Sequence, residues 1–398
     1  MLKKLLFVAI ASFQLIYGMK NLETNEEWVK PREVVITRIG ADIDHKAPIC
    51  AIEPNSFSPN HFLSKDENGK IILWYIKEMD GNIYLESLRA FQDTSDSHFL
   101  MWHPTDSCVF SSASKVWNAS TDKALFGVES YNPMFFPSNP SSFLTIKTGH
   151  YSEQALCMNT ISKNKKNEFI LAEKSCNIPF AGAKIDCCSR ISFKKNIFVL
   201  GTSGNLQIWE IDQKSKKPFS FSFDLDLEKT RTKRIEDVID PKKKNTKRMS
   251  GIKFALQVET NKRTITTLEI NQRNGEFIAV GFNSNDIEIW DISKRMFYCG
   301  FHSAEDEIIS MCWHPRYECI LAALSSQQIK IISIEKQQLL FFPAKNASFI
   351  SWIPDHSNWL LVGYKDGTMK IFEISEGRLE ELSSFGRSYQ GFFEKNKK

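Results

Sequence analysis

The sequence predicts an all-β protein, a seven-bladed β-propeller of four-stranded antiparallel blades. Three observations lead to this prediction. A polar turn followed by an apolar run with an aromatic residue recurs along the chain, at intervals of about 40 residues. The apolar runs are short and continuous, as expected of strands buried on both faces. Turns rich in proline, glycine and asparagine separate them, and proline and glycine are disfavoured inside a strand.

The recurring motif fixes the period of the repeat. Clear copies lie at residues 68–74, 204–209, 285–291 and 366–372, and weaker ones at 115–118 and 328–332. Trp74 and Trp117 are 43 residues apart, and Trp290 and Ile332 are 42 apart. The interval of 92 residues from Trp117 to Trp209 predicts a degenerate copy near Asn159.

Each repeat is expected to form strand a, a proline-containing turn, strand b, an Asn/Asp/Gly turn, strand c, a short turn and strand d. Blades are predicted to begin near residues 47, 97, 131, 185, 264, 308 and 348, within a single propeller domain of residues 19–390. Because the third blade is poorly defined, six or eight blades is the alternative. Residues 33–39 are expected to close the ring as a strand donated to the last blade; residues 379–385 could fill that place instead.

These motifs resemble those of the WD-repeat family, whose period and strand-ending tryptophan they share. Trp290-Asp291 is the one copy of the eponymous dipeptide, and Phe301-His302 and Asp44-His45 are partial matches to the Gly-His of the d–a loop. The resemblance implies these structural repeat positions: Trp74, Trp117, Trp209, Trp290, Asp291, Asp366 and Phe372. Only Asp366 is a clear turn aspartate, so the hydrogen-bond network typical of the family is expected to be incomplete.

The N-terminus has the pattern of a secretory signal peptide. Lys3 and Lys4 precede an apolar run at residues 5–17, and Gly18 offers a small residue for cleavage. The alternative is an amphipathic or buried N-terminal strand. Export would place the nine cysteines in an oxidising compartment, but their spacing matches no disulfide framework or zinc motif, so most are expected to be packing thiols. Asn118-Ala119-Ser120 and Asn346-Ala347-Ser348 are N-glycosylation tripeptides, which matter in a eukaryote.

One stretch, residues 213–250, lengthens the fourth repeat. Between residues 229 and 248 it holds nine Lys and Arg against three Asp and Glu. Alignment of the neighbouring repeats predicts residues 255–259 as strand d of blade four, so that 213–250 would interrupt the c–d hairpin. Within it, residues 219–227 could form an extra edge strand. We expect a solvated loop, or a contact for an acidic or anionic partner. A basic tail follows at residues 391–398.

The sequence contains no catalytic motif of the metalloprotease, phosphate-binding-loop, dinucleotide-binding or nucleophile-elbow type. Asp42, Asp44 and His45 are of metal-ligand type but fit a polar loop, so we expect no metal and no cofactor. The net charge of +4 and the predicted export argue against nucleic-acid binding.

We therefore expect a non-catalytic scaffold, monomeric and secreted or periplasmic, that binds a protein partner through propeller loops. The alternative is an exported hydrolase or lyase with a channel-mouth site, which needs convergent carboxylates or histidines. Candidate partner-binding residues come from the predicted loops and from the basic stretch: Lys65, Asp66, Asn283, Asp306, Tyr364, Lys365, Lys242, Lys243 and Lys244.

Overall fold

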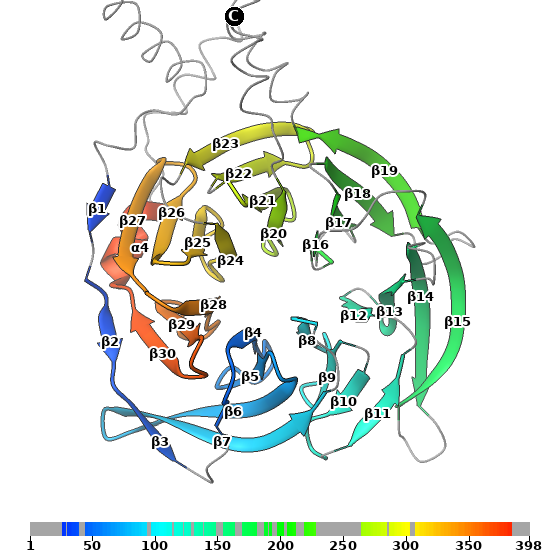
Figure 1. Cartoon of the computed structure of the whole chain (residues 1–398), viewed down its shortest axis with the longest axis horizontal. Coiled ribbons are helices and arrows are strands. Elements are labelled where there is room, and N and C mark those ends of the chain that lie inside the picture. The colour runs from blue at the N-terminus through cyan, green and yellow to red at the C-terminus, as the bar shows by residue number, and fades with distance from the viewer. Residues whose placement is uncertain are drawn as a thin grey trace, which may run out of the picture.

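Seven sheets form a ring in which strand a of each blade is innermost and strand d outermost (Figure 1). The computed structural model describes residues 26–28, 30–39, 44–93, 97–113, 115–121, 123–128, 131–137, 139–148, 154–163, 169–180, 187–189, 191–192, 197–202, 205–211, 219–227, 264–284, 286–302 and 307–383. The predicted fold class is thus confirmed. The predicted signal peptide lies outside the described residues.

Strands follow one another through the ring in chain order. Blade one holds β4 (Ile49–Pro54), β5 (His61–Asp66), β6 (Lys70–Met79) and β7 (Asn82–Gln92). Blade two holds β8 (Leu100–Trp102), β9 (Val109–Ser112), β10 (Lys115–Asn118) and β11 (Ala124–Gly127). Blade three holds β12 (Tyr131–Phe136), β13 (Asn139–Thr148), β14 (Gln154–Lys163) and β15 (Phe169–Phe180). Blade four holds β16 (Cys187–Cys188), β17 (Ile197–Thr202), β18 (Asn205–Ile211) and β19 (Phe219–Asp226).

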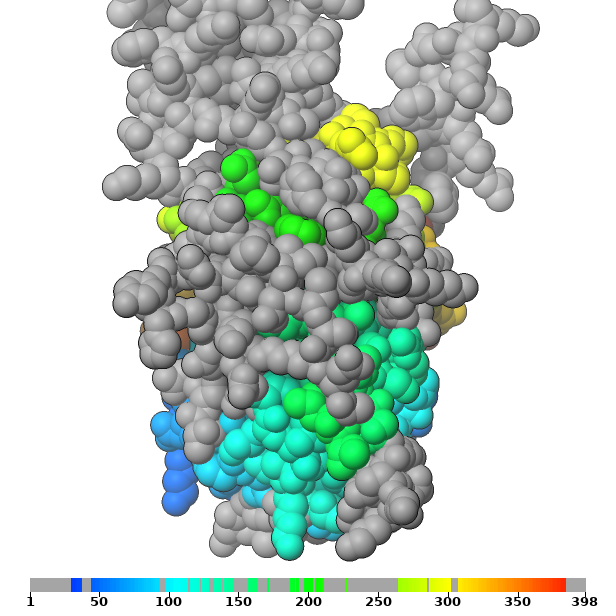
Figure 2. Space-filling model, turned by 90° about the vertical axis from the view of Figure 1, so that its right-hand side faces the viewer, coloured from blue at the N-terminus to red at the C-terminus, as the bar shows by residue number. Residues whose placement is uncertain are grey.

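The remaining blades complete the circle. Blade five holds β20 (Ile265–Ile270), β21 (Phe277–Phe282), β22 (Asp286–Asp291) and β23 (Met296–His302). Blade six holds β24 (Ile308–Trp313), β25 (Ile320–Ser325), β26 (Gln328–Ser333) and β27 (Gln338–Pro343). Blade seven holds β28 (Ala347–Trp352), β29 (Trp359–Tyr364) and β30 (Met369–Glu373). Seen edge-on from the side of blades three and four, the described surface runs from cyan through green to yellow (Figure 2).

One register relates all seven blades. The residue at the tryptophan position of strand c always pairs with an apolar residue of strand b: Trp74 with Phe62, Trp117 with Phe110, Asn159 with Phe143, Trp209 with Phe198, Trp290 with Ile278, Ile332 with Leu321 and Phe372 with Leu360. In blades one, two and four the paired Phe and Trp rings stack, with centroids 6.2–6.3 Å apart. Asn159 therefore occupies the degenerate position in blade three.

The chain upstream of blade one runs along three blade edges. β2 (Arg32–Val34) pairs antiparallel with β30 and supplies the fourth strand of blade seven. β3 (Ile36–Ile39) pairs parallel with β7 of blade one, and β1 (Glu26–Trp28) pairs parallel with β27 of blade six. We call β1, β2 and β3 the N-terminal strap. Each of these three strands pairs with the edge strand of its blade, so each blade edge gains backbone hydrogen bonds that it would otherwise lack.

This arrangement confirms the predicted ring closure in part, because Glu33 and Val34 belong to β2, the N-terminal strand that completes blade seven. Residues 33–39 do not form one strand on blade seven; they divide between blade seven and blade one. The strand is interrupted at Val35, which pairs with neither blade and is 82% exposed where the chain crosses from blade seven to blade one. The alternative closing segment is wrong, because residues 379–383 belong to helix α4 (Glu376–Ser383), which buries Leu379 and Leu382.

The basic stretch also lies elsewhere than predicted. Strand d of blade four is β19, which pairs antiparallel with β18 along its length. In β19, Phe and Leu alternate with Ser and Asp, the pattern of a strand with one buried face. The prediction that residues 213–250 interrupt the c–d hairpin is therefore wrong, and residues 228–263 follow strand d instead. Residues 255–259 lie outside the described part of the chain.

Candidate functional site

The predicted partner-binding residues that the structure describes lie at b–c turns, which share one face of the ring with the d–a connections. Asn283 is exposed in blade five, where its side-chain oxygen accepts the Thr264 N–H at 2.9 Å. Lys365 is exposed at the turn of blade seven. Asp306 and Lys242, Lys243 and Lys244 lie outside the described residues. We call this side the b–c face.

Tyr364, beside Lys365, is half-buried and packs against the apolar cluster of blades five to seven. Burial, together with the charges of Glu33 and Asp366, raises the pKa of Tyr364 to about 12. Lys370 lies 5.8 Å from the centre of the Tyr364 ring and 2.9 Å from the Glu33 carboxylate. Lys370 therefore links the Tyr364 ring to Glu33 of the strap, and part of the Tyr364 side chain is already used in core packing.

Lys65 is a buried residue, which corrects its assignment to a binding surface. Its side chain is 1% exposed, and its Nζ lies 3.1 Å from Asp93 Oδ2, which also accepts the Ser112 hydroxyl. In blades four, five and seven the equivalent residue is a glycine, packed closely against strand a of the next blade. Strand a of blade two is short. We infer that the Lys65–Asp93 pair fills the space this leaves between blades one and two.

Asp66 is also buried, in a chain of hydrogen bonds within blade one. Trp74 Nε1 donates to Ser64 Oγ at 2.7 Å, and Ser64 Oγ lies 2.6 Å from His45 Nε2. His45 Nδ1 lies 3.0 Å from Asp66 Oδ2, and because a carboxylate only accepts, Nδ1 carries the proton. Burial favours a higher pKa for Asp66, but the bonds from His45 and from the Lys70 N–H outweigh it and lower the pKa.

Sequence reasoning missed this chain of bonds because it took Asp66 for a loop residue. The available signal was the turn Glu67-Asn68-Gly69 directly after Asp66, together with His45 ahead of strand a. The aspartate that was expected to take this role, Asp366, is exposed and accepts the N–H of Thr368 within its own turn at 2.9 Å.

The opposite face, formed by a–b and c–d turns, carries a repeated contact between neighbouring blades. The residue directly after strand a accepts backbone N–H groups of its own a–b turn: Asn55 in blade one, His103 in blade two, Asn271 in blade five and His314 in blade six. Three of them also donate to the next blade, from Asn55 to Ser107 O (3.1 Å), from His103 to Pro140 O (2.9 Å) and from Asn271 to Glu318 O (2.8 Å). We call these residues the turn clamps.

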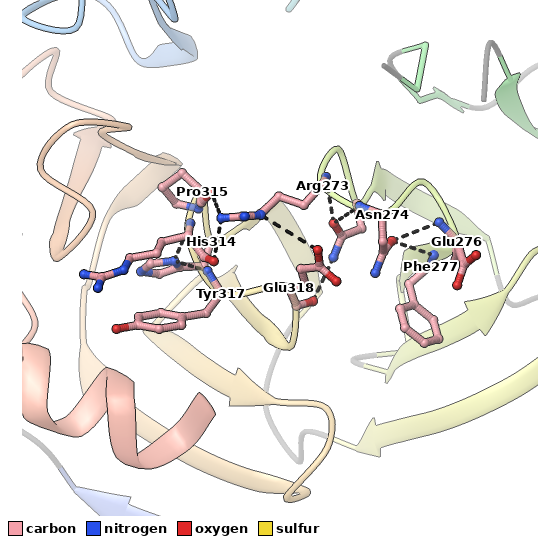
Figure 3. Close-up of polar contacts among 10 residues, drawn as sticks. Arg273, Asn274, Glu276, Phe277, His314, Pro315, Tyr317 and Glu318 are labelled. Atoms are coloured by element: carbon pink, nitrogen blue, oxygen red, sulfur yellow. Dashed lines mark hydrogen bonds and ion pairs between the residues drawn. The ribbon is translucent and has the colours of Figure 1, made fainter. Parts of the chain in front are cut away.

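Figure 3 shows the a–b turn of blade five, with Arg273 and Asn274, beside the turn of blade six that holds the clamp His314. Arg273 reaches across from blade five, and its Nη1 donates to the Pro315 and Arg316 carbonyls at 3.1 and 2.6 Å. Arg316 in turn pairs with Glu376 of α4 at 2.6 Å. The charged groups of this face are thus used to join blade five, blade six and the C-terminal helix.

The described residues offer little that resembles reaction chemistry. Among them, no group of three or more His, Cys, Asp or Glu could hold a metal ion. Burial raises the pKa of Cys50 and Cys319 to about 12, which keeps both as unreactive thiols. The cysteines whose side chains are described are all free, including the neighbours Cys187 and Cys188.

No protein-family model matches the chain, and no curated protein matches it either. In the part of the chain that the structure describes, no helix is long and apolar enough to cross a membrane.

Proposed function

We propose that this protein is a divergent WD-repeat propeller that serves as a non-catalytic scaffold and binds a protein partner on its b–c face. The hydrogen-bonded chain from Trp74 through Ser64 and His45 to Asp66 supports the family assignment, because it joins the residue types by which the family is recognised. The sequence pattern at residues 1–18 supports export. N-terminal sequencing of exported protein should then give a start near Met19.

One observation carries the choice of face. Polar groups of the a–b face are used in contacts between blades, as in Asn55, His103 and Asn271. Exposed polar groups of the b–c face, such as Glu67, Asn68 and Lys365, lie on short turns of their own blades. A partner can therefore contact the b–c face without competing with the bonds that hold neighbouring blades together.

The basic stretch supports an acidic partner for the same face. Because β19 is strand d of blade four, residues 228–263 connect blade four to blade five, and d–a connections share the side of the b–c turns. The described residues at the two ends of this connection are Leu227 and Thr264. Nine basic side chains between residues 229 and 248 would attract a negatively charged protein surface.

The test compares two surface variants of the full chain as bait in the exporting compartment. The b–c variant is Asn68→Glu with Asn283→Glu, which should repel an acidic partner, and the matched a–b variant is Thr105→Glu with Thr121→Glu, all at exposed positions. A partner that cross-links to the wild type and the a–b variant, but not to the b–c variant, supports the proposal. Equal loss in both variants, or turnover of a hydrolase or lyase substrate by the wild type, would speak against it.

A further inference from the structure

The chain contains the same tripeptide, Asn-Ala-Ser, at two places with different surroundings. Asn346 lies in the connection between β27 and β28, where it is exposed and has a positive φ of 64°. Its backbone carbonyl accepts the Lys365 N–H at 2.9 Å. Within the described part of the chain, its carboxamide makes no hydrogen bond, so a group attached to its Nδ2 would break no bond of the folded ring.

Asn118 is placed differently. It ends β10 and is half-buried, and its side-chain oxygen accepts the Ser120 N–H at 2.8 Å. The following residue, Ala119, is buried in blade two and donates its N–H to the Cys108 carbonyl. A bulky group on Asn118 would have to share the space of this turn, whereas one on Asn346 would point into solvent.

We propose that Asn346 is an N-glycosylation site. The inference rests on the proposed export, here into a eukaryotic secretory pathway. The donor is an oligosaccharide linked to lipid pyrophosphate. The Asn346 Nδ2 forms a bond to the anomeric carbon of the first sugar and loses one proton, while the bond from that carbon to the pyrophosphate oxygen breaks and the lipid pyrophosphate leaves with the electron pair.

The structure also assigns the stage of folding at which Asn346 is glycosylated. The Ser348 hydroxyl belongs to the recognised tripeptide, and in the folded ring it donates to the Ile49 carbonyl at 2.6 Å, with the Gly363 carbonyl at 3.2 Å. Ile49 belongs to blade one, so the first of these bonds forms only when blade seven packs against blade one. Transfer must therefore precede ring closure, because the closed ring no longer offers a free hydroxyl.

A glycan at this position bears on the proposed partner face. Asn346 is bonded to the b–c turn of blade seven through Lys365, so the sugar stands beside Lys365 and Asp366. Partner contacts would then be confined to the turns of other blades, such as Glu67 and Asn68 of blade one.

The experiment expresses the full chain in cultured eukaryotic secretory cells, once with its own residues 1–18 and once with a cleavable signal peptide of known function in their place. Gel mobility is measured before and after treatment with a peptide N-glycosidase. With the known signal peptide, we expect a glycosidase-sensitive shift that Asn346→Gln abolishes and Asn118→Gln leaves in place. Folded, unmodified chain incubated with solubilised oligosaccharyltransferase and lipid-linked donor should remain unshifted.

Each outcome decides a separate claim. A secreted chain without a glycan, or one whose shift survives Asn346→Gln, overturns the site. Modification of the folded chain overturns the assigned timing. If the known signal peptide gives a glycan on Asn346 while the chain with its own N-terminus stays unmodified in the cytosol, the site stands and the proposed export fails.

Discussion

Replacing His314 tests how the turn clamps respond to acid. Its side chain is 1% exposed, and burial lowers its pKa from 6.5 to about 3; the Ser357 carbonyl opposes the shift, and the charges of Arg316 and Arg273 add to it. Below pH 6.5 the unfolded chain binds a proton at this residue that the folded chain excludes. The stability that His314 contributes is therefore complete above pH 6.5 and falls as the pH drops towards 3.

The size of this effect follows from the shift. One pKa unit corresponds to about 1.4 kcal/mol, so lowering the pH from 7 to 5 should cost about 2 kcal/mol through His314 alone. Asparagine is the natural replacement, because Asn55 and Asn271 fill the same position in blades one and five. His314→Asn should remove this part of the acid sensitivity, and because it also removes a ring packed against Tyr317 and Trp352, it should cost about 1–3 kcal/mol at pH 7.

The measurement is the free energy of unfolding in urea, followed by tryptophan fluorescence at pH 7 and pH 5. The control is His356→Asn, which changes a partly exposed histidine of blade seven and should keep the acid loss due to His314. Equal acid loss in the wild type and in His314→Asn would refute the reasoning, because it would show that the buried imidazole is not what resists protonation.

Three further substitutions test the packing. Asp93→Leu leaves the buried Lys65 cation without its partner and should cost about 3–5 kcal/mol in urea unfolding, whereas the double change with Lys65→Met should be nearly neutral. Trp290→Ala removes a fully buried ring and should cost about 3–5 kcal/mol; a loss below about 1 kcal/mol would contradict its place in the core. Val34→Asp, at a half-buried strap position, should raise hydrogen exchange in blade seven, whereas Val35→Asp, at the exposed neighbour, should not; equal effects would contradict the strap geometry.

The fold could be predicted because its signal is repeated. A tryptophan or other large apolar residue lies opposite an apolar residue of strand b in six of the seven blades, so the degenerate copy at Asn159 can be located from its neighbours. The strap gave no such signal. Its strands are three or four residues long, and nothing in their sequence says that they pair with three different blades.

The buried charges were missed for a different reason. Polar residues at the end of a strand are ordinarily exposed, and Lys65 and Asp66 follow an apolar run directly before a turn. Their burial depends on partners far along the chain, since Asp93 is 28 residues and His45 is 21 residues away. Such pairs are found only when the fold brings them together. The misplaced basic stretch shows the same limit: alignment of the repeats assigned strand d to residues 255–259 and left 219–227 as an extra edge strand, and only the pairing of β19 with β18 identifies strand d.

The contact between blades seven and one has no polar side chain at its turn-clamp position, and the N-terminal strap crosses it. Ile353 occupies the turn-clamp position of blade seven, and its N–H donates to the Trp359 carbonyl as the clamp residues' N–H groups do in their own blades. Since its side chain is apolar, it forms no polar bond to blade one. The strap, the Ser348 bond to Ile49 and an apolar cluster shared by the two blades take over that role. Because the strap is synthesised before blade seven, this contact cannot form until blade seven has been made, and loss of the strap should weaken the ring here.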